Sequence, residues 1–184
     1  MPEGPEIRRA GDRLIRALVD KEIVESNFYY ERIKDKEKIV KNKNIKEITT
    51  RGKAMLIRFM NGWSMYSHNQ LYGRWTVNLN TTKIKSSRAL RVVFTTNKHT
   101  VRLWSATDID LIPTAEENEH SFLKKLGPYV LNESCGFQLI EERLTSKSFN
   151  KKKASSLMLD QTAFAGLGNY LRSEILFDAK IHPD

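Results

Sequence analysis

The hydrophobic positions at the start of the chain repeat at the spacing of an α-helix. Ile7, Leu14 and Leu18 fall on one face of such a helix, and arginines are distributed over the rest of its surface. Pro5 suits a first helical turn, and the acidic residues beside it lie at the end of a helix where negative charge is favourable. The pattern therefore predicts an amphipathic helix that begins near Pro5.

From about residue 21 the hydrophobic residues come in short runs that are typical of β-strands. Asn61-Gly62 separates the runs 53–60 and 63–68, and this dipeptide is the strongest local signal for a two-residue hairpin. The runs 90–96 and 100–106 predict a second hairpin. Their imperfect alternation of apolar and polar residues is expected of strands in a sandwich core. These elements predict a two-layer β domain.

Beyond Pro113 the pattern changes to helices. We expect helical segments at residues 115–126, 137–144, 151–160 and 169–179, with Gly127-Pro128 ending the first. The predicted fold is therefore α+β. A leading helix and a β-sandwich occupy residues 1–112, and a helical domain occupies residues 113–184.

Composition narrows the class of protein. Lys and Arg total 31 against 22 acidic residues, a net charge of +9 that would attract a polyanion, although a merely basic surface gives the same excess. Cys135 is the single cysteine, which excludes a disulfide framework and a cysteine-based metal site in this chain. No run reaches the ~18 apolar residues of a membrane span, and the N-terminus lacks a signal peptide's apolar stretch. We expect an intracellular protein without a membrane partner.

The first residues carry candidate chemistry. Removal of Met1, which is normal before a small residue, would expose the secondary amine of Pro2. An α-amino group has a pKa of about 7.7–8.0, so part of it is neutral near pH 7 and can attack the anomeric carbon of a deoxyribose to form an iminium. Glu3 is the adjacent acid that would open the sugar or protonate the departing group. Taken alone, the segment also fits a helix start punctuated by prolines.

A second candidate is the turn Arg51-Gly52-Lys53, which leads into the first hairpin. Glycine would let the backbone turn there and project Lys53 from the rim of the sheet. Lys53 would then contact a phosphate or a sugar oxygen, or it is a solvated lysine beside a β turn.

A third candidate follows the second strand of that hairpin. Gln70, Leu71 and Tyr72 offer a hydrogen-bonding, an apolar and an aromatic side chain directly before Gly73. An enzyme that flips a nucleotide out of a duplex must fill the hole, and such side chains suit that task. The alternative is that Leu71 and Tyr72 belong to the sandwich core. His68, just before them, is expected to pack or to form hydrogen bonds rather than to catalyse.

The start of the last helix is a fourth candidate. Its backbone amides, with Asn169 beside them, could hold a phosphate, and the lysines at residues 151–153 add positive charge upstream. The alternative is a solvated basic face with glycines as simple punctuation.

These four pieces occur in this order in one known family. The sequence resembles the formamidopyrimidine-DNA glycosylase and endonuclease VIII superfamily over residues 2–183, and residues 67–73 and 165–172 are similar to bacterial endonuclease VIII. The resemblance implies a β-sandwich followed by a helix–two-turn–helix DNA-binding domain. It implies excision of oxidised bases, mainly pyrimidines, and then strand cleavage at the abasic site.

The resemblance also implies roles for individual residues. Pro2 becomes the Schiff-base nucleophile, Glu3 the proton donor and Lys53 the second donor, used in elimination, while Glu6 belongs to the same catalytic cluster. The implied DNA contacts are made by Gln70, Leu71, Tyr72, Lys125 and Asn169. Of these, Lys125 stands where a related enzyme has an arginine, so its phosphate contact would be a point charge without bidentate geometry.

One departure from the family pattern concerns a metal. The family normally continues with a zinc finger held by four cysteines, whose hairpin arginine enters the DNA and assists the second elimination. Cys135 alone cannot build that site. We therefore expect no cofactor in this chain. We also expect either a fragment or a naturally shortened form, with weakened DNA affinity and impaired δ-elimination.

Two classes of function follow. The first is a bifunctional glycosylase/lyase of base-excision repair, a monomer in the bacterial cytoplasm, at the nucleoid, acting on duplex DNA with oxidised bases or abasic sites. The second is a catalytically weak remnant that binds damaged DNA through Gln70-Leu71-Tyr72 and Asn169. An RNA-binding protein would leave Pro2, Glu3 and Lys53 unexplained.

Overall fold

The computed structural model describes residues 1–183, which form two compact units. Unit 1 comprises Met1–Pro2, Glu6–Thr50 and Ala54–Asn118. Unit 2 comprises Glu3–Pro5, Arg51–Lys53 and the chain from Glu119 onward. Two short segments from the N-terminal part of the sequence are thus built into the C-terminal unit.

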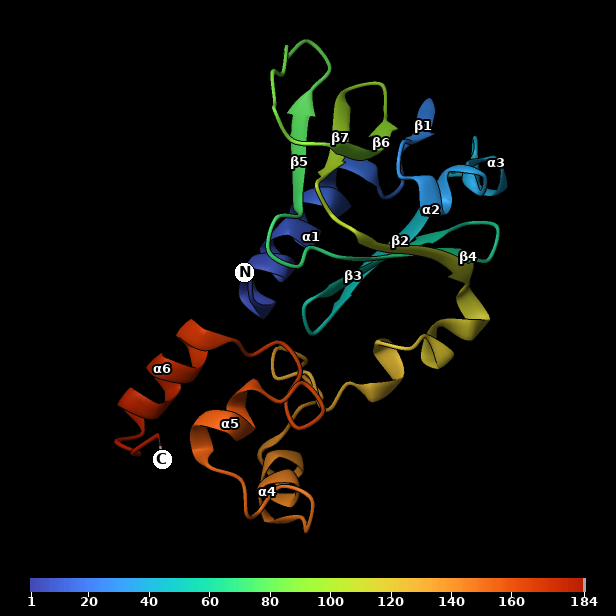
Figure 1. Ribbon diagram of the computed structural model, residues 1–184. Helices are drawn as coiled ribbons and strands as arrows, with labels where there is room; N and C mark the ends of the chain where they lie inside the picture. Colours follow the sequence, from blue (N-terminus) through green and yellow to red (C-terminus); the bar gives the residue numbers. More distant parts are fainter. Residues whose placement is uncertain (184) are drawn as a thin grey trace. The chain divides into compact units, whose positions relative to one another are not determined.

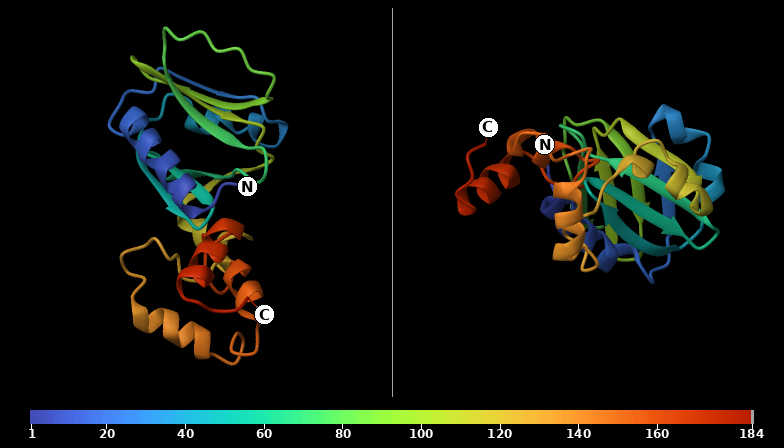
Figure 2. Two further views of the ribbon diagram at one scale, coloured as in Figure 1. Left: turned by 90° about the vertical axis from the view of Figure 1, so that its left-hand side faces the viewer. Right: turned by 90° about the horizontal axis from the view of Figure 1, so that it is seen from below.

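Unit 1 contains two four-stranded antiparallel sheets, which Figures 1 and 2 show as two layers. One sheet has the order β1-β6-β7-β5 and the other the order β2-β3-β4-β8. The strands are β1 (Glu25–Phe28), β2 (Ile45–Arg51), β3 (Ala54–Phe59), β4 (Trp63–His68), β5 (Arg74–Leu79), β6 (Leu90–Thr95), β7 (His99–Trp104) and β8 (Asp108–Pro113). The prediction of a two-layer β domain is confirmed.

The N-terminal helix is α1 (Gly4–Leu18). Ile7, Leu14 and Leu18 are buried and pack in the core of unit 1, as their spacing predicts. Two further helices, α2 (Glu31–Lys34) and α3 (Glu37–Val40), lie where only strands were expected. Each is a single turn, which is too short to show a helical repeat in the sequence.

Both predicted hairpins are present. β3 pairs with β4 in a register that sets Arg58 opposite Ser64, so the connection is the three residues 60–62 rather than the two-residue turn expected at Asn61-Gly62. Gly62 has a φ of 79°, a conformation that glycine adopts without strain. β6 pairs with β7, with an irregularity in register between Leu90 and Val92. An extra residue in one strand shifts the side chains after it to the other face, which accounts for the imperfect alternation of this run.

The helical part of the chain contains α4 (Phe137–Thr145), α5 (Ala154–Leu159) and α6 (Asn169–Asp178). The core of unit 2 is formed by Phe149, Leu157, Ala163, Phe164 and Leu167. The α+β class is confirmed. The helix expected at residues 115–126 is wrong in detail, because the chain forms two short 3₁₀ segments there, η1 (Thr114–Glu119) and η2 (Leu123–Lys125). None of the helices in residues 1–183 has the length and apolarity that a bilayer crossing demands.

Candidate functional site

Glu3 is the most constrained of the candidate residues. Its side chain is 3% exposed, and its carboxylate lies at the start of α6 within unit 2. Oε1 accepts the backbone N–H of Tyr170 at 3.0 Å, and Oε2 accepts that of Leu171 at 3.2 Å. The first amides of a helix have no partner within the helix and favour negative charge. Glu3 therefore caps α6, and both of its oxygens are held in place.

This capping changes the expectation for the start of α6. The backbone amides of Tyr170 and Leu171, expected to bind a phosphate, donate to Glu3 instead. Asn169, the first residue of α6, remains exposed beside them. Lys125, at the end of η2, is exposed as well.

Gly168, the residue before α6, makes room for the Glu3 side chain. A Cβ atom at this position would come well within 3.0 Å of the Glu3 carboxyl carbon. The backbone of Gly168 is extended, with a φ of −142°, so other residues tolerate its conformation. The requirement for glycine here is one of space for Glu3.

Lys53 belongs to the same unit and is also buried, at 7% exposure. Burial lowers the pKa of Lys53 below its ordinary value, and the nearby charge of Glu3 opposes part of that effect. The interpretation of Lys53 as a solvated lysine is therefore wrong. Gly52 has a φ of 61°, and a Cβ atom there would lie 3.1 Å from that of Ala165, so glycine both turns the chain and allows this close approach.

Pro2 and Glu6 line a pocket of about 290 Å³ in unit 1. The wall of the pocket is completed by α1, by the loop after β4 and by the strand β5. Its other lining residues are Ile7, Ala10, Arg13, Asn69, Gly73, Arg74, Trp75, Thr76, Val77 and Asn78. This volume is close to the lower end of the range for small-molecule sites.

The loop after β4 presents Leu71 and Tyr72 to the surface. Their exposed fractions are 60% and 68%, so the interpretation of these two residues as sandwich core is wrong. Gln70 is exposed as well, and its backbone adopts a left-handed conformation with a φ of 50°. His68 is buried, and its Nδ1 accepts the backbone N–H of Gln70 at 3.0 Å, the kind of structural contact that was expected of it.

Several residues around these sites carry no recognisable signal in the sequence. The roles of Gly168 and of the Tyr170 and Leu171 amides depend on a contact between segments 167 residues apart, for which no local pattern exists. Arg88 is another such residue, and its guanidinium donates to the carbonyl of Tyr72 at 2.6 Å. Arg88 lies in a loop with other basic residues, and nothing in the sequence of that loop predicts its contact with Tyr72.

The zinc site implied by the family does not fit these residues. Cys135 is the single cysteine of the sequence. Within residues 1–183, no group of three or more His, Cys, Asp or Glu side chains is placed to hold a metal ion. A structural zinc ion requires four such ligands in tetrahedral arrangement.

Two family models match the chain. The formamidopyrimidine-DNA glycosylase N-terminal domain matches residues 1–107, and the formamidopyrimidine-DNA glycosylase H2TH domain matches residues 126–184. The chain is 42% identical over 183 residues to an endonuclease 8 of Pectobacterium carotovorum, covering 100% of this chain and 70% of that protein. It is 44% identical over 178 residues to an endonuclease 8 of Salmonella agona, covering 96% of this chain and 67% of that protein.

Solved structures show the same fold. A Lactococcus lactis formamido-pyrimidine DNA glycosylase bound non-covalently to DNA with an AP site superposes with a TM-score of 0.80 at 24% identity, covering 98% of this chain and 70% of that chain. A structure of MutM in complex with DNA that contains carbocyclic 8-oxo-G also gives 0.80, at 25% identity, covering 99% of this chain and 70% of that chain.

Proposed function

The chain belongs to the formamidopyrimidine-DNA glycosylase and endonuclease VIII superfamily, and we propose from this that it is a DNA glycosylase/AP lyase of base-excision repair that uses Pro2 as its nucleophile. The observation that supports the chemistry best is the burial of Glu3 and Lys53 in one unit, with the Glu3 carboxylate fixed by two amides. Pro2 is the residue before Glu3 and opens onto the pocket of unit 1.

In the proposed first step, the Pro2 nitrogen attacks the anomeric carbon of the damaged nucleotide. The bond between that carbon and the base breaks, and the base leaves with the proton that the Pro2 nitrogen loses. The bond between the anomeric carbon and the ring oxygen then breaks as Glu3 protonates that oxygen, which opens the sugar and leaves an iminium between the sugar and the enzyme. Two backbone amides hold the Glu3 carboxyl group in place at the start of α6.

Strand cleavage follows from the iminium. Water takes a proton from the carbon next to the iminium, and the bond from the 3′ carbon to the phosphate oxygen breaks, so that the phosphate departs. Lys53 is the proposed second proton donor, acting on that phosphate oxygen. Its lowered pKa brings proton exchange closer to neutral pH than is usual for a lysine. The protein contributes only side chains and the Pro2 amine to these steps.

The Pro2 nitrogen must be an amine for this chemistry. In the full sequence it forms a peptide bond with Met1, and an amide nitrogen is not a nucleophile. We propose that the active form is the processed protein that begins at Pro2.

The proposed substrate is duplex DNA with oxidised bases, mainly pyrimidines, or with abasic sites. The net charge of +9 favours association with it. Exposed Leu71 and Tyr72 fill the gap left by the flipped nucleotide, Gln70 contacts the orphaned base, and Asn169 and Lys125 contact phosphates. We propose that the enzyme acts as a monomer in the cytoplasm, at the nucleoid, without a membrane partner.

The alternative of a catalytically weak remnant is not favoured. Burial of a lysine costs free energy, and DNA binding alone gives no reason to maintain it.

Borohydride trapping on a duplex with an oxidised pyrimidine tests the proposal. Protein that begins at Pro2 should form a covalent adduct. The same protein with an N-terminal extension that a protease can remove should bind DNA without trapping, and cleavage back to Pro2 should restore the adduct. Pro2→Gly should reduce trapping strongly. An adduct that forms equally well with the extension in place would show that another amine is the nucleophile.

A further inference from the structure

Gln70 lies in a loop whose backbone is closely defined. The backbone N–H of Gln70 donates to Nδ1 of His68, and the backbone N–H of Gly73 closes the loop by donating to the carbonyl of Asn69 at 2.7 Å. A Cβ atom at Gly73 would come well within 3.0 Å of that carbonyl oxygen. The main chain at Gln70 is therefore fixed, but its long side chain has three rotatable bonds that the loop does not restrain.

Thr107 is placed beside this loop by the register of the sheet. In the pairing of β4 with β8, His68 lies opposite Asp108, so the residue before β8 faces the residues that follow β4. Ala106 is fully buried in the core, and the hydroxyl of Tyr30 donates to the carbonyl of Thr107 at 2.8 Å. Thr107 is thus held from both sides, although its own side chain is exposed.

The Thr107 hydroxyl donates to Oε1 of Gln70 at 2.6 Å. We propose that Thr107 is a positioning residue, which holds the Gln70 side chain in the rotamer that meets the base opposite the flipped nucleotide. The inference rests on the proposed function, in which Gln70 contacts that base. Because Oε1 of Gln70 accepts the hydrogen bond from Thr107, the two N–H donors of Gln70 Nε2 make the proposed contact with the base.

This arrangement has a consequence for specificity. Ordering an exposed, rotamer-rich side chain costs free energy on binding, and a contact formed before binding removes part of that cost. A side chain held in one orientation also distinguishes base edges by their acceptors and donors, whereas a mobile one adapts to each. Thr107 therefore affects discrimination between opposite bases as well as affinity.

The test uses duplexes with an abasic-site analogue placed opposite each of the four bases. Thr107→Val removes the hydroxyl at nearly constant shape, and Thr107→Ser keeps it. Loss of one hydrogen bond corresponds to roughly threefold to tenfold in affinity. We expect Thr107→Val to weaken DNA binding by that amount. We also expect it to reduce the ratio of affinities between the duplex with the best-bound opposite base and the duplex with the worst-bound one. Thr107→Ser and the control Thr81→Val, an exposed threonine elsewhere in unit 1, should stay near the wild type.

Two further measurements separate positioning from folding and from DNA binding. Gln70→Glu keeps the acceptor for Thr107 but removes the N–H donors, so it should lose discrimination while its thermal unfolding is unchanged. In free protein, ¹⁵N relaxation should show a more mobile Gln70 side-chain amide in Thr107→Val than in wild type or in Thr107→Ser.

The outcomes are distinguishable. Unchanged affinity ratios in Thr107→Val, or an equally mobile Gln70 amide, would overturn the positioning role and leave the glycosylase/lyase proposal intact. Failure of the wild type to bind any of the four duplexes would overturn the proposed function, and the role of Thr107 with it.

Discussion

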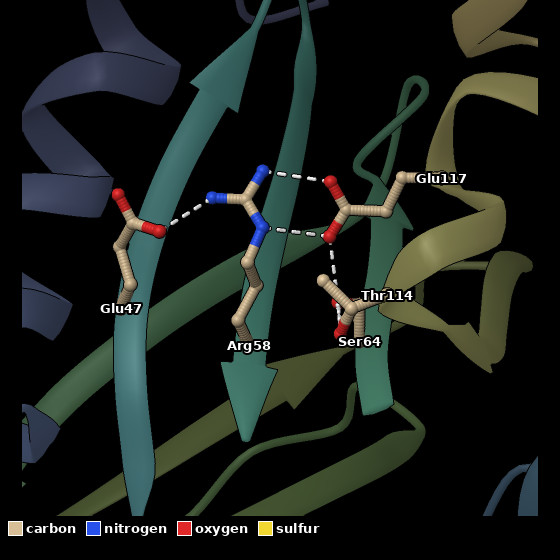
Figure 3. A network of polar contacts seen from close by, with 5 residues as sticks. All are labelled: Glu47, Arg58, Ser64, Thr114 and Glu117. Carbon is tan, nitrogen blue, oxygen red and sulfur yellow. Dashed lines mark hydrogen bonds and ion pairs between the residues drawn. The ribbon is translucent and has the colours of Figure 1, made fainter. Parts of the chain in front are cut away.

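Arg58 and Glu117 form a two-bond ion pair in unit 1, in which Nε donates to Oε1 and Nη2 donates to Oε2, each at 2.7 Å (Figure 3). The Ser64 hydroxyl donates to Oε1 of the same carboxylate at 2.6 Å and also contacts the Thr114 hydroxyl. Glu47 accepts a third hydrogen bond from Arg58. The ion pair of Arg58 with Glu117 holds η1 against the sheet, and Glu117 is the residue before Asn118, where unit 1 ends.

Glu117→Ala should destabilise the protein by about 2–3 kcal/mol, because the Arg58 guanidinium then keeps only the hydrogen bond to Glu47 and the buried Ser64 hydroxyl keeps only its contact with Thr114. Urea unfolding at neutral pH measures the change. The control is Asp12→Ala, which removes the exposed ion pair with Arg8 and should cost no more than about 0.5 kcal/mol. Equal losses from the two substitutions would show that the buried pair contributes nothing beyond a surface contact.

Gly168→Ala should reduce borohydride trapping by about 10²-fold, because the new methyl group displaces the Glu3 carboxylate from the start of α6. Single-turnover trapping rates on an abasic duplex measure the effect. Gly136→Ala is the matched control, since Gly136 also precedes a helix and a Cβ atom there meets nothing within 4 Å. In a Glu3→Ala background the space is empty, so Gly168→Ala should cause no additional loss of thermal stability. A rate near that of wild type would contradict the requirement for space at residue 168.

Lys53→Met should abolish most strand cleavage, with a loss of about 10²-fold or more, yet leave the free energy of unfolding at pH 7 unchanged or raised by about 1 kcal/mol. The physical reason is that burial disfavours the ammonium form, as the lowered pKa of Lys53 shows. Lys46→Met, at an exposed site on β2, is the control for loss of a positive charge. A strongly destabilised Lys53→Met protein would indicate that Lys53 has a structural role instead.

The pH dependence of that stability difference has a definite sign. Between the lowered pKa of folded Lys53 and its ordinary value of 10.5, the unfolded chain binds more protons than the folded one at this residue. The stability of the wild type should therefore rise relative to Lys53→Met as the pH increases through this window. Thermal unfolding of both proteins at a series of alkaline pH values checks the direction, and a difference independent of pH would contradict it.

Replacing both Leu71 and Tyr72 by alanine should leave thermal unfolding unchanged, because both side chains are largely exposed. Excision from a paired duplex should fall by roughly 10²-fold, since unstacking a base costs a few kcal/mol that these side chains offset. The same lesion in single-stranded DNA has no hole to fill, so trapping on it should change little. Equal losses of activity on duplex and single-stranded DNA would show that these residues contribute to general DNA affinity rather than to nucleotide flipping.

The sequence predicts those parts of the fold that depend on neighbours in the chain. Gly62 indicates the turn between β3 and β4 by its freedom to adopt a positive φ, and the buried face of α1 follows from helical spacing. The sequence does not predict whether Leu71 and Tyr72 are exposed, because an apolar or aromatic side chain suits a protein core and also suits insertion into a gap in DNA. Composition cannot decide between these environments, and only the surrounding fold does.

The candidate site depends on distant parts of the chain and was less predictable. Lys53 follows a turn, which is the usual place of a solvated lysine, yet it is buried, and the preceding Gly52 lies close to Ala165, far away in the sequence. The capping of α6 by Glu3 similarly requires the tertiary fold, since Ser, Thr, Asp or Asn immediately before a helix is the pattern that sequence reading recognises. Gly168 stands in that position here, and the cap comes from the other end of the sequence.

The cap of α6 also bears on synthesis of the protein. Glu3 leaves the ribosome among the first residues, whereas the amide of Tyr170 that holds it is made 167 residues later. At 5–20 residues per second, this interval is roughly ten to thirty seconds. The nascent chain thus carries its proposed reactive terminus long before the acid beside it is fixed. Glu3 therefore reaches its fixed position only in a chain synthesised at least as far as Leu171.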